Sequence, residues 1–474
     1  MKWTKEQKTV IDLRGCNILV SAAAGSGKTA VLIERIVSQV TDPVNPVNID
    51  EFVIVTFTRL AAAQMKEKLQ TALEKKLEEE PENRHLQKQV MLLPVTQIST
   101  IHSFCGYIIQ NYFHQTGVDP SYRVANESEL NMIRSDVLAE LLEEEYTRLD
   151  DDFVDMAKMA KFIKSDTEIE KVILKLYNDA MSEPFPEDFF ARMRQFLSCE
   201  SEEELEQTVF IQKIMEYVKN LGRGIYNQYD IWLSLCESQG GPRVYVDFLQ
   251  KERSQFELFD GIGSFDALRK RMAEISFGRL PAKKDPDVEE EKKLYVQDAR
   301  NAVKALLKKI RQDLLAEDLP ALLDTMKQMR GKLLTFLSLA EKFAERYREA
   351  KREKNIADFN DLEQMALEIL VKKENGRIVR TQAAEELSGQ FHEIMIDEYQ
   401  DSNLVQELLL SSVAKENNRF MVGDIKQSIY RFRKARPDLF LEKMTTYETT
   451  EGAKNRLVFL TKNFRSRDVV LEAA

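Results

Sequence analysis

Six short apolar runs, each followed by polar residues, form the strongest pattern along the chain. They are Ile18–Val20, Phe52–Val55, Val95–Thr100, Glu393–Ile396, Phe420–Val422 and Leu457–Leu460. Runs of this length predict buried β-strands. Apolar residues at helical spacing follow the second run, as in the stripe of Ala62, Met65, Leu69 and Leu73. Strand–loop–helix units of this kind predict an α/β fold.

Residues 119–355 have a different pattern, in which strands are not expected and long helical patterns alternate with acidic runs. The best helical pattern lies near its end, with a stripe of Phe336, Leu337, Ala340, Phe343, Ala344 and Tyr347. Lysines and arginines fill much of the other face, and such a face is more often solvated than bound to nucleic acid. We therefore predict an all-helical domain inserted into the α/β domain, which resumes near residue 356.

The composition narrows the class of protein. Of 474 residues 31% are charged, and the formal net charge of −11 argues against a basic coat but allows a local basic groove. The four cysteines lie far apart without a C-x-x-C pair, so neither a disulfide framework nor a cysteine metal site is expected. We find no signal peptide and no apolar run near the ~18 residues of a membrane span. We expect a cytoplasmic protein.

The segment from Ala22 to Thr29 has the composition of a phosphate-binding loop between a strand and a helix. Gly25 and Gly27 can turn tightly, so backbone N–H groups converge on an anion beside the positive end of the helix dipole. Lys28 is expected to face the terminal phosphates, and the Thr29 hydroxyl to be a ligand of Mg²⁺. The predicted nucleotide-binding residues are Ala22, Ala23, Ala24, Gly25, Ser26, Gly27, Lys28 and Thr29, with Ala22 where this motif usually has glycine.

Gln7, upstream of the loop, has two interpretations. In the first, Thr4 caps a helix whose first turn carries Glu6 and Gln7. In the second, the Gln7 amide uses its donor and its acceptor to read an adenine edge. The phosphate loop that follows favours the second interpretation, which adds Gln7 to the nucleotide-binding residues.

Two adjacent carboxylates, Asp397 and Glu398, directly follow the buried run that ends at Ile396. We expect Asp397 to hold Mg²⁺, directly or through water, and Glu398 to orient and deprotonate an attacking water. Gln427, after the next run, is predicted to sense a terminal phosphate. Helix capping is the alternative role for the two acids, but it leaves the buried strand before them unexplained.

Three of the predicted strand ends carry residues that suit nucleic-acid contact. The candidates are Thr58, Arg59, His102, Ser103, Phe104, Tyr430, Phe432 and Arg433. Basic residues interleaved with aromatic rings, as in the last three, are typical of surfaces that stack single-stranded bases. For His102 a purely structural role is the commoner outcome, with contact to a nucleic-acid backbone as the alternative.

Taken in order, these segments resemble the motifs of superfamily 1A helicases of the UvrD/Rep/PcrA type. The matching motifs are Gln7, Ala22–Thr29, Thr56–Arg59, Ser99–Phe104, Asp397–Asp401, Val422–Arg433 and Asn463–Ser466. Within this superfamily the resemblance is greatest to the AddA branch, the helicase–nuclease subunits of bacterial AddAB complexes. The features that indicate this branch are the phosphate loop, the residues of Lys426–Arg433, the large helical insert and Asp358–Leu362. Phe432 stands where UvrD-like enzymes carry Trp, which implies base stacking on a smaller ring.

The resemblance implies a RecA-like P-loop NTPase domain, with a parallel sheet flanked by helices, at residues 1–118 and 356–454. It assigns residues 119–355 to the helical insert and residues 455–474 to the start of a second RecA-like domain. It further implies an ATP- and Mg²⁺-dependent DNA helicase that processes double-strand breaks for recombinational repair. Such an enzyme follows a single-stranded track from a duplex end and forms a heterodimer with an AddB-type partner.

The resemblance also implies that the later helicase motifs and the nuclease domain lie beyond Ala474. Arg465 would then be a catalytic arginine from the second wall of the nucleotide cleft. The strand Leu457–Leu460 would lack its own neighbours, and we expect it to be disordered or to pair with another sheet edge. We accordingly expect the 474-residue chain to bind ATP weakly and not to unwind DNA. A nucleotide- and DNA-binding module that turns over nothing is the alternative for this chain.

Overall fold

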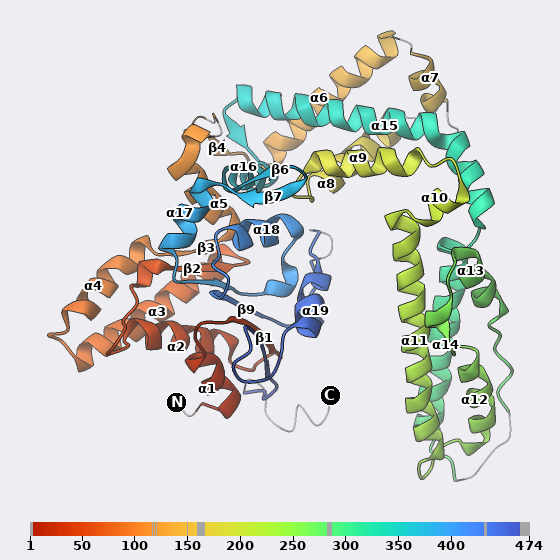
Figure 1. Ribbon diagram of the computed structural model, residues 1–474, viewed down its shortest axis with the longest axis horizontal. Helices are drawn as coiled ribbons and strands as arrows, with labels where there is room; N and C mark the ends of the chain where they lie inside the picture. The colour runs from red at the N-terminus through yellow and green to blue at the C-terminus, as the bar shows by residue number, and fades with distance from the viewer. Residues whose placement is uncertain are drawn as a thin grey trace. The chain divides into compact units, whose positions relative to one another are not determined.

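The computed structural model describes residues 3–115, 117, 119, 121–148, 150–158, 166–281, 287–430 and 434–464. The chain forms two compact units (Figure 1). The first consists of Met1–Glu144, Glu170–Phe189 and Ala340–Ala474, and the second of Glu145–Ile169 and Phe190–Leu339. We describe each unit separately.

A six-stranded parallel sheet forms the centre of the first unit, which confirms the predicted fold class. Its strands are β1 (Asn17–Ala22), β2 (Phe52–Thr56), β3 (Gln97–Thr100), β8 (Glu393–Ile396), β9 (Arg419–Gly423) and β10 (Asn455–Leu460). Their order across the sheet is β10-β1-β9-β8-β2-β3. The strands alternate little between apolar and polar residues, because both faces of the sheet are buried.

Two apolar layers cover the two faces of this sheet. One layer packs strand residues such as Ile18 and Val20 against α1 (Lys5–Asp12), α2 (Lys28–Val40) and α3 (Arg59–Glu79). The other packs residues such as Leu19 against α5 (Ile101–Tyr112), α16 (Phe359–Leu370), α17 (Gln382–Gln390) and α18 (Leu404–Ser412). Successive side chains along each strand point to opposite faces of the sheet, so they pack into two separate cores. The loops at the strand ends lie at the rim of the sheet.

The smaller elements of the first unit are two short strand pairs and two further helices. They are the parallel pair β4 (Arg123–Val124) and β5 (Ile356–Ala357), the hairpin β6 (Val371–Glu374) and β7 (Arg377–Arg380), and helices α4 (Arg84–Leu92) and α19 (Pro437–Thr446). Asn375 and Gly376, both with positive φ, form the two-residue hairpin loop, as expected for an Asn-Gly turn.

The expectation that Leu457–Leu460 is disordered is wrong, and its alternative, pairing with another sheet edge, is confirmed. β10 runs parallel to β1, with Leu457 opposite Leu19 and Leu460 opposite Ala22, so it is the edge strand of the same sheet. The backbone of β10 therefore forms its hydrogen bonds with β1. Nothing in the sequence indicates this pairing, because β1 lies more than four hundred residues upstream. The strand therefore belongs to the first unit and does not open a second domain.

All regular secondary structure among the described residues of the second unit is helical. Its helices are α7 (Asp151–Ala157), α10 (Glu202–Glu206), α11 (Val209–Glu237), α12 (Val246–Ser254), α13 (Phe265–Glu274) and α14 (Glu290–Asp313). Four further helices have residues in both units, namely α6 (Glu127–Arg148), α8 (Asp166–Ala180), α9 (Pro186–Leu197) and α15 (Leu319–Glu353). Arg300, Glu252 and the Tyr229 hydroxyl form a buried polar cluster between three of these helices.

The helical unit is smaller than the predicted insert. Residues 121–144, 170–189 and 340–355, which the sequence pattern assigned to the insert, belong to the unit that contains the sheet. Lys351 illustrates why the pattern misled, since this lysine on the basic face of α15 is buried. Its Nζ lies 2.8 Å from Asp358 Oδ2 and 2.6 Å from Asp361 Oδ2, which anchors the end of α15 to the start of α16.

None of the described helices has the length and apolar character that crossing a membrane requires.

Candidate active site

The segment after β1 turns tightly before α2, as a phosphate-binding loop requires. Gly25 and Gly27 adopt φ values of 74° and 83°, a region that residues with a Cβ rarely occupy. Gly27 is the N-cap of α2, so its position has no side chain to occupy the amide groups of the first turn. Ala22, the departure from the usual motif, is buried as the last residue of β1 and packs into the core. The loop therefore keeps its shape without glycine there.

The Gln7 amide holds this loop against α1. Gln7 Nε2 donates to the Ser26 carbonyl at 3.0 Å, while Oε1 accepts from the Thr4 amide at 3.0 Å in a capping box. The capping interpretation is therefore confirmed, and the side chain also reaches the phosphate loop. Contact with an adenine stays a prediction, and the amide retains a second N–H and a second lone pair for it.

The two carboxylates lie at the end of β8, on the same edge of the sheet as the phosphate loop. Lys28 Nζ is 3.4 Å from Glu398 Oε2. Glu398 has a φ of 55°, an unfavourable conformation for a residue with a side chain, and strain of this kind clusters at functional sites. Burial raises the pKa of Asp397 to about 6, the Glu398 charge adds to the rise, and Lys28 opposes it. The site is therefore electrostatically costly without a cation beside Asp397.

Gln400, a residue that sequence reasoning missed, connects Glu398 to the end of β9. Its Nε2 donates to Glu398 Oε2 at 2.9 Å, and its Oε1 accepts from the Asp424 amide at 3.0 Å. This approach needs Gly423, because a Cβ there would collide with Gln400 Oε1. Gln427 ends the short turn η7 (Ile425–Gln427) and donates to Asp424 Oδ2 at 2.6 Å. The predicted phosphate sensor is thus linked to Glu398 through two residues.

The side chains at this edge suit Mg²⁺ and a nucleotide triphosphate. A hydroxyl at Thr29 and a carboxylate at Asp397 are oxygen ligands, and Mg²⁺ in such sites takes its other ligands from phosphates and water. The Ser26 hydroxyl is buried in the loop without a hydrogen-bond partner among the described residues. The donor set therefore fits the predicted ion, although the described residues hold no cluster of three or more candidate metal ligands.

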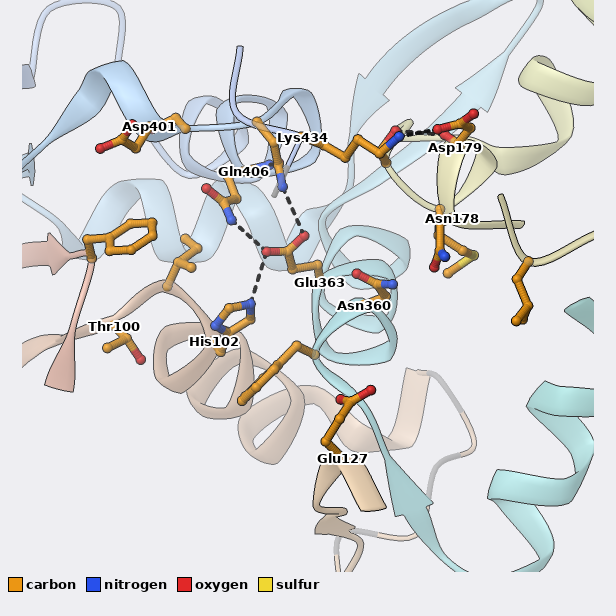
Figure 2. Close-up of a pocket in the computed structure, with 18 of the residues that line it drawn as sticks. Thr100, His102, Glu127, Asn178, Asp179, Asn360, Glu363, Asp401, Gln406 and Lys434 are labelled. Atoms are coloured by element: carbon orange, nitrogen blue, oxygen red, sulfur yellow. Dashed lines mark hydrogen bonds and ion pairs between the residues drawn. The ribbon is translucent and has the colours of Figure 1, made fainter. Parts of the chain in front are cut away.

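A cavity of about 1120 Å³ adjoins the two carboxylates within the first unit. Its wall includes Asp397 and Glu398 at one place and His102, Phe359 and Arg59 at others. Figure 2 shows His102 and Gln406 directed toward Glu363, which lies between them. The remaining polar and charged side chains of the wall are Thr56, Thr100, Glu127, Asn131, Arg134, Ser135, Glu170, Lys171, Lys175, Asn178, Asp179, Ser182, Asn360, Asp401, Ser402, Asn403 and Lys434.

The structure places most of the predicted nucleic-acid contacts at the rim of the sheet. Thr58 caps α3 by accepting from the Ala61 amide, and Arg59 and Ser103 are exposed. His102 is partly exposed, with Nε2 at 3.2 Å from Glu363 Oε1 and its ring 4.4 Å from that of Phe359. Its structural role is thus established, and contact with nucleic acid stays a prediction.

The prediction for Phe104 is wrong. This ring is fully buried in the core between the sheet and α16, with its centroid 6.0 Å from that of Phe391. Two positions along an α-helix turn a side chain through about 200°. A helix that exposes His102 therefore buries Phe104, and the ring cannot reach a base.

The aromatic and basic stretch after β9 is described except at residues 431–433. The Tyr430 ring is partly exposed and lies 4.3 Å from the Phe57 ring, between the centroids. Phe432, Arg433 and Arg465 lie outside the described residues. Their predicted roles stay predictions.

Comparisons with known proteins agree with this geometry. The model of the UvrD/REP helicase N-terminal domain matches residues 3–448. The chain is 45% identical over 99% of its length to a protein of Lachnoclostridium phytofermentans that is named as one subunit of an ATP-dependent helicase/nuclease, and it covers 35% of that protein. A protein of the same name from Clostridium perfringens strain SM101 is 40% identical over 99% of the chain. Another from Clostridioides difficile strain 630 is 38% identical over 100% of the chain, and the chain covers 38% of each of these two proteins.

The chain therefore spans little more than a third of the length of these curated relatives. The family match extends over nearly the whole chain, including the phosphate loop, the carboxylate pair and Gln427. The chain belongs to the UvrD/REP helicase N-terminal domain family.

Proposed function

We propose that this chain is the ATP-hydrolysing motor part of a DNA helicase–nuclease. The observation that carries the proposal is the meeting of the phosphate loop and the carboxylate pair, with Lys28 Nζ 3.4 Å from Glu398 Oε2. The shared name of the relatives, which describes an ATP-dependent helicase/nuclease, supports the same activity. A loop that binds phosphates beside an acid that can accept a proton is the minimum needed for nucleotide hydrolysis.

In this proposal ATP is the substrate, and the amide groups of the loop and the first turn of α2 bind its phosphates. Thr29 and Asp397 would hold Mg²⁺, which when bound neutralises charge on the phosphate oxygens. When ATP binds, Lys28 would exchange Glu398 for the terminal phosphates as its partner. This exchange would leave Glu398 free to accept a proton from the attacking water.

Single-stranded DNA is the proposed track, along the rim that carries Thr58, Arg59, His102, Ser103 and Tyr430. Exposed Arg59 and partly exposed His102 both line the cavity beside the carboxylates, so track and nucleotide are close within one unit. Phe432 and Arg433 are included in this proposal as the stacking ring and a phosphate contact. Arg465 is included as the catalytic arginine that completes the nucleotide cleft.

For the whole protein we propose the processing of double-strand breaks for recombinational repair. The relatives are named as one subunit of a larger enzyme, which supports a protein partner, and we propose that this partner is of the AddB type in a heterodimer. We also propose a cytoplasmic location, in agreement with four buried free cysteines.

The proposal is tested by anisotropy titration of a fluorescent deoxythymidine oligonucleotide at several salt concentrations. Wild-type chain should bind, and Arg59→Gln should reduce the slope of log K against log salt by about 1, the loss of one phosphate contact. Arg84→Gln, which removes another exposed arginine that does not line the cavity, should leave the slope unchanged. Binding without any salt dependence, or equal slopes for the two variants, would contradict the proposed track.

A further inference from the structure

The Glu363 carboxylate is a buried acid with hydrogen-bond donors from two other helices. Its side chain is only 6% exposed. Oε1 lies 3.2 Å from His102 Nε2 and accepts from Gln406 Nε2 at 2.7 Å, and Oε2 accepts from Asn403 Nδ2 at 3.5 Å (Figure 2). A buried carboxylate is costly unless donors surround it, so these three side chains are held in place by the same group.

The three donors come from opposite sides of the site. His102 is in the first turn of α5 and faces the cavity, where its ring packs on that of Phe359. Asn403 is the N-cap of α18, and Gln406 lies in the first turn of that helix. α18 directly follows the segment that contains the carboxylate pair.

Two hydrogen bonds of Gln400 and a short stretch of backbone link this cluster to Glu398, the acid expected to activate water. Gln400 Nε2 donates to Glu398 Oε2 at 2.9 Å and lies 3.2 Å from Asp401 Oδ2. Only Ser402 separates Asp401 from the helix cap Asn403. A displacement of α18 relative to α16 would therefore act on Glu398 at one end and on the Glu363 cluster at the other.

We propose that Glu363 is a positioning residue that couples occupancy of the DNA track to the nucleotide site. It fixes the His102 ring by holding Nε2, which leaves Nδ1 as the ring nitrogen for a nucleic-acid contact. Through Gln406 and Asn403 it ties this ring to the start of α18. The inference rests on the proposed function, because it needs both a bound oligonucleotide and a bound nucleotide.

A purely structural role makes a different prediction. If Glu363 only joined three helices, its replacement would lower stability and weaken both ligands without changing the effect of one on the other. A coupling role changes that mutual effect, because coupling is a free energy shared by two sites. The readout must therefore be a ratio of affinities rather than an affinity.

The test measures the dissociation constant of a deoxythymidine oligonucleotide with and without saturating Mg²⁺ and a non-hydrolysable ATP analogue. For the wild-type chain the two constants should differ. Glu363→Gln keeps the shape but removes the charge, and it should move their ratio about threefold or more toward unity. Glu368→Gln, an exposed acid one and a half turns further along α16, is the matched control and should keep the wild-type ratio.

Gln406→Met, which removes one donor at similar volume, should move the ratio in the same direction, and it decides the matter if Glu363→Gln does not fold. An unchanged ratio in a folded Glu363 or Gln406 variant would overturn the coupling role, as would a wild-type ratio of one. Failure of the wild-type chain to bind the oligonucleotide at all would instead refute the proposed track.

Discussion

Lys28 and Glu398, separated by 370 residues in the sequence, meet at one edge of the sheet with Nζ 3.4 Å from Oε2. The contact joins the phosphate loop after β1 to the acidic turn after β8. In the proposed function the Lys28 ammonium group and the Glu398 carboxylate have different roles once a triphosphate is bound, namely phosphate binding and proton acceptance. The first two mutations separate these tasks.

Lys28→Ala should abolish Mg·ATP binding, because it removes the charge that faces the terminal phosphates. Glu398→Gln should retain binding and stop hydrolysis, because only the proton-accepting role is lost. Calorimetric titration with Mg·ATP, beside a phosphate-release assay, measures both effects in a version extended to the length of the relatives, because the 474-residue chain is expected to bind ATP weakly. Equal loss of ATP binding in the two variants would rule out this division of roles.

The buried Asp397 predicts an unusual dependence of stability on pH. Because its pKa is raised to about 6, the folded chain binds more protons than the unfolded chain between its ordinary pKa near 4 and pH 6. Its contribution to stability is therefore full at low pH and is lost as the pH rises through 6. Without Mg²⁺, Asp397→Asn should raise the melting temperature at pH 8 by roughly 2–4 °C and have little effect at pH 4. A larger gain at pH 4 than at pH 8 would contradict the assignment.

Gly423→Ala should disturb the contact between Gln400 and Asp424, because the added Cβ would meet Gln400 Oε1. We expect a loss of about 1–3 kcal/mol in the free energy of unfolding and a fall in hydrolysis rate as Glu398 loses its partner. Gly389→Ala in α17 is the matched control, since a Cβ there meets nothing within 4 Å. Urea denaturation measures the stability, and similar losses in both variants would refute the argument.

Phe432→Ala should affect DNA binding, whereas Phe104→Ala should affect the stability of the fold. If a base stacks on Phe432, its loss should weaken oligonucleotide binding by ~1–3 kcal/mol with little change in the salt slope. Phe104→Ala should instead reduce the free energy of unfolding by about 3–5 kcal/mol, because it leaves a cavity in the core. Unchanged DNA affinity for Phe432→Ala would place that ring away from the track.

The sequence was sufficient for those parts of the fold and site that are contiguous along the chain. Strand, loop and helix follow one another around Lys28, so their arrangement was predictable from the sequence pattern. The order of the strands was not, and the pairing of β10 with β1 had no local signal. Phe104 was misassigned because a contiguous motif was taken as one surface, whereas a helix sends its second residue after His102 inward.

Glu363 and Gln400 were missed for a related reason. Both are polar residues in helical or turn segments, where most such residues are solvated. Their partners His102, Gln406 and Asp424 lie from 24 to 261 residues away. Only the three-dimensional contacts show that these side chains are buried and shared between elements.

The most direct test of the central claim is ATP hydrolysis with and without single-stranded DNA. The assay compares this 474-residue chain with a version extended to the length of its relatives, each with and without Glu398→Gln. We predict DNA-stimulated hydrolysis in the longer version, lost on Glu398→Gln. Turnover in the 474-residue chain should be at least ~10³-fold slower, as expected if a further catalytic arginine comes from the part of the relatives that this chain does not cover. Comparable turnover in the two, or hydrolysis that survives Glu398→Gln, would contradict the site described above.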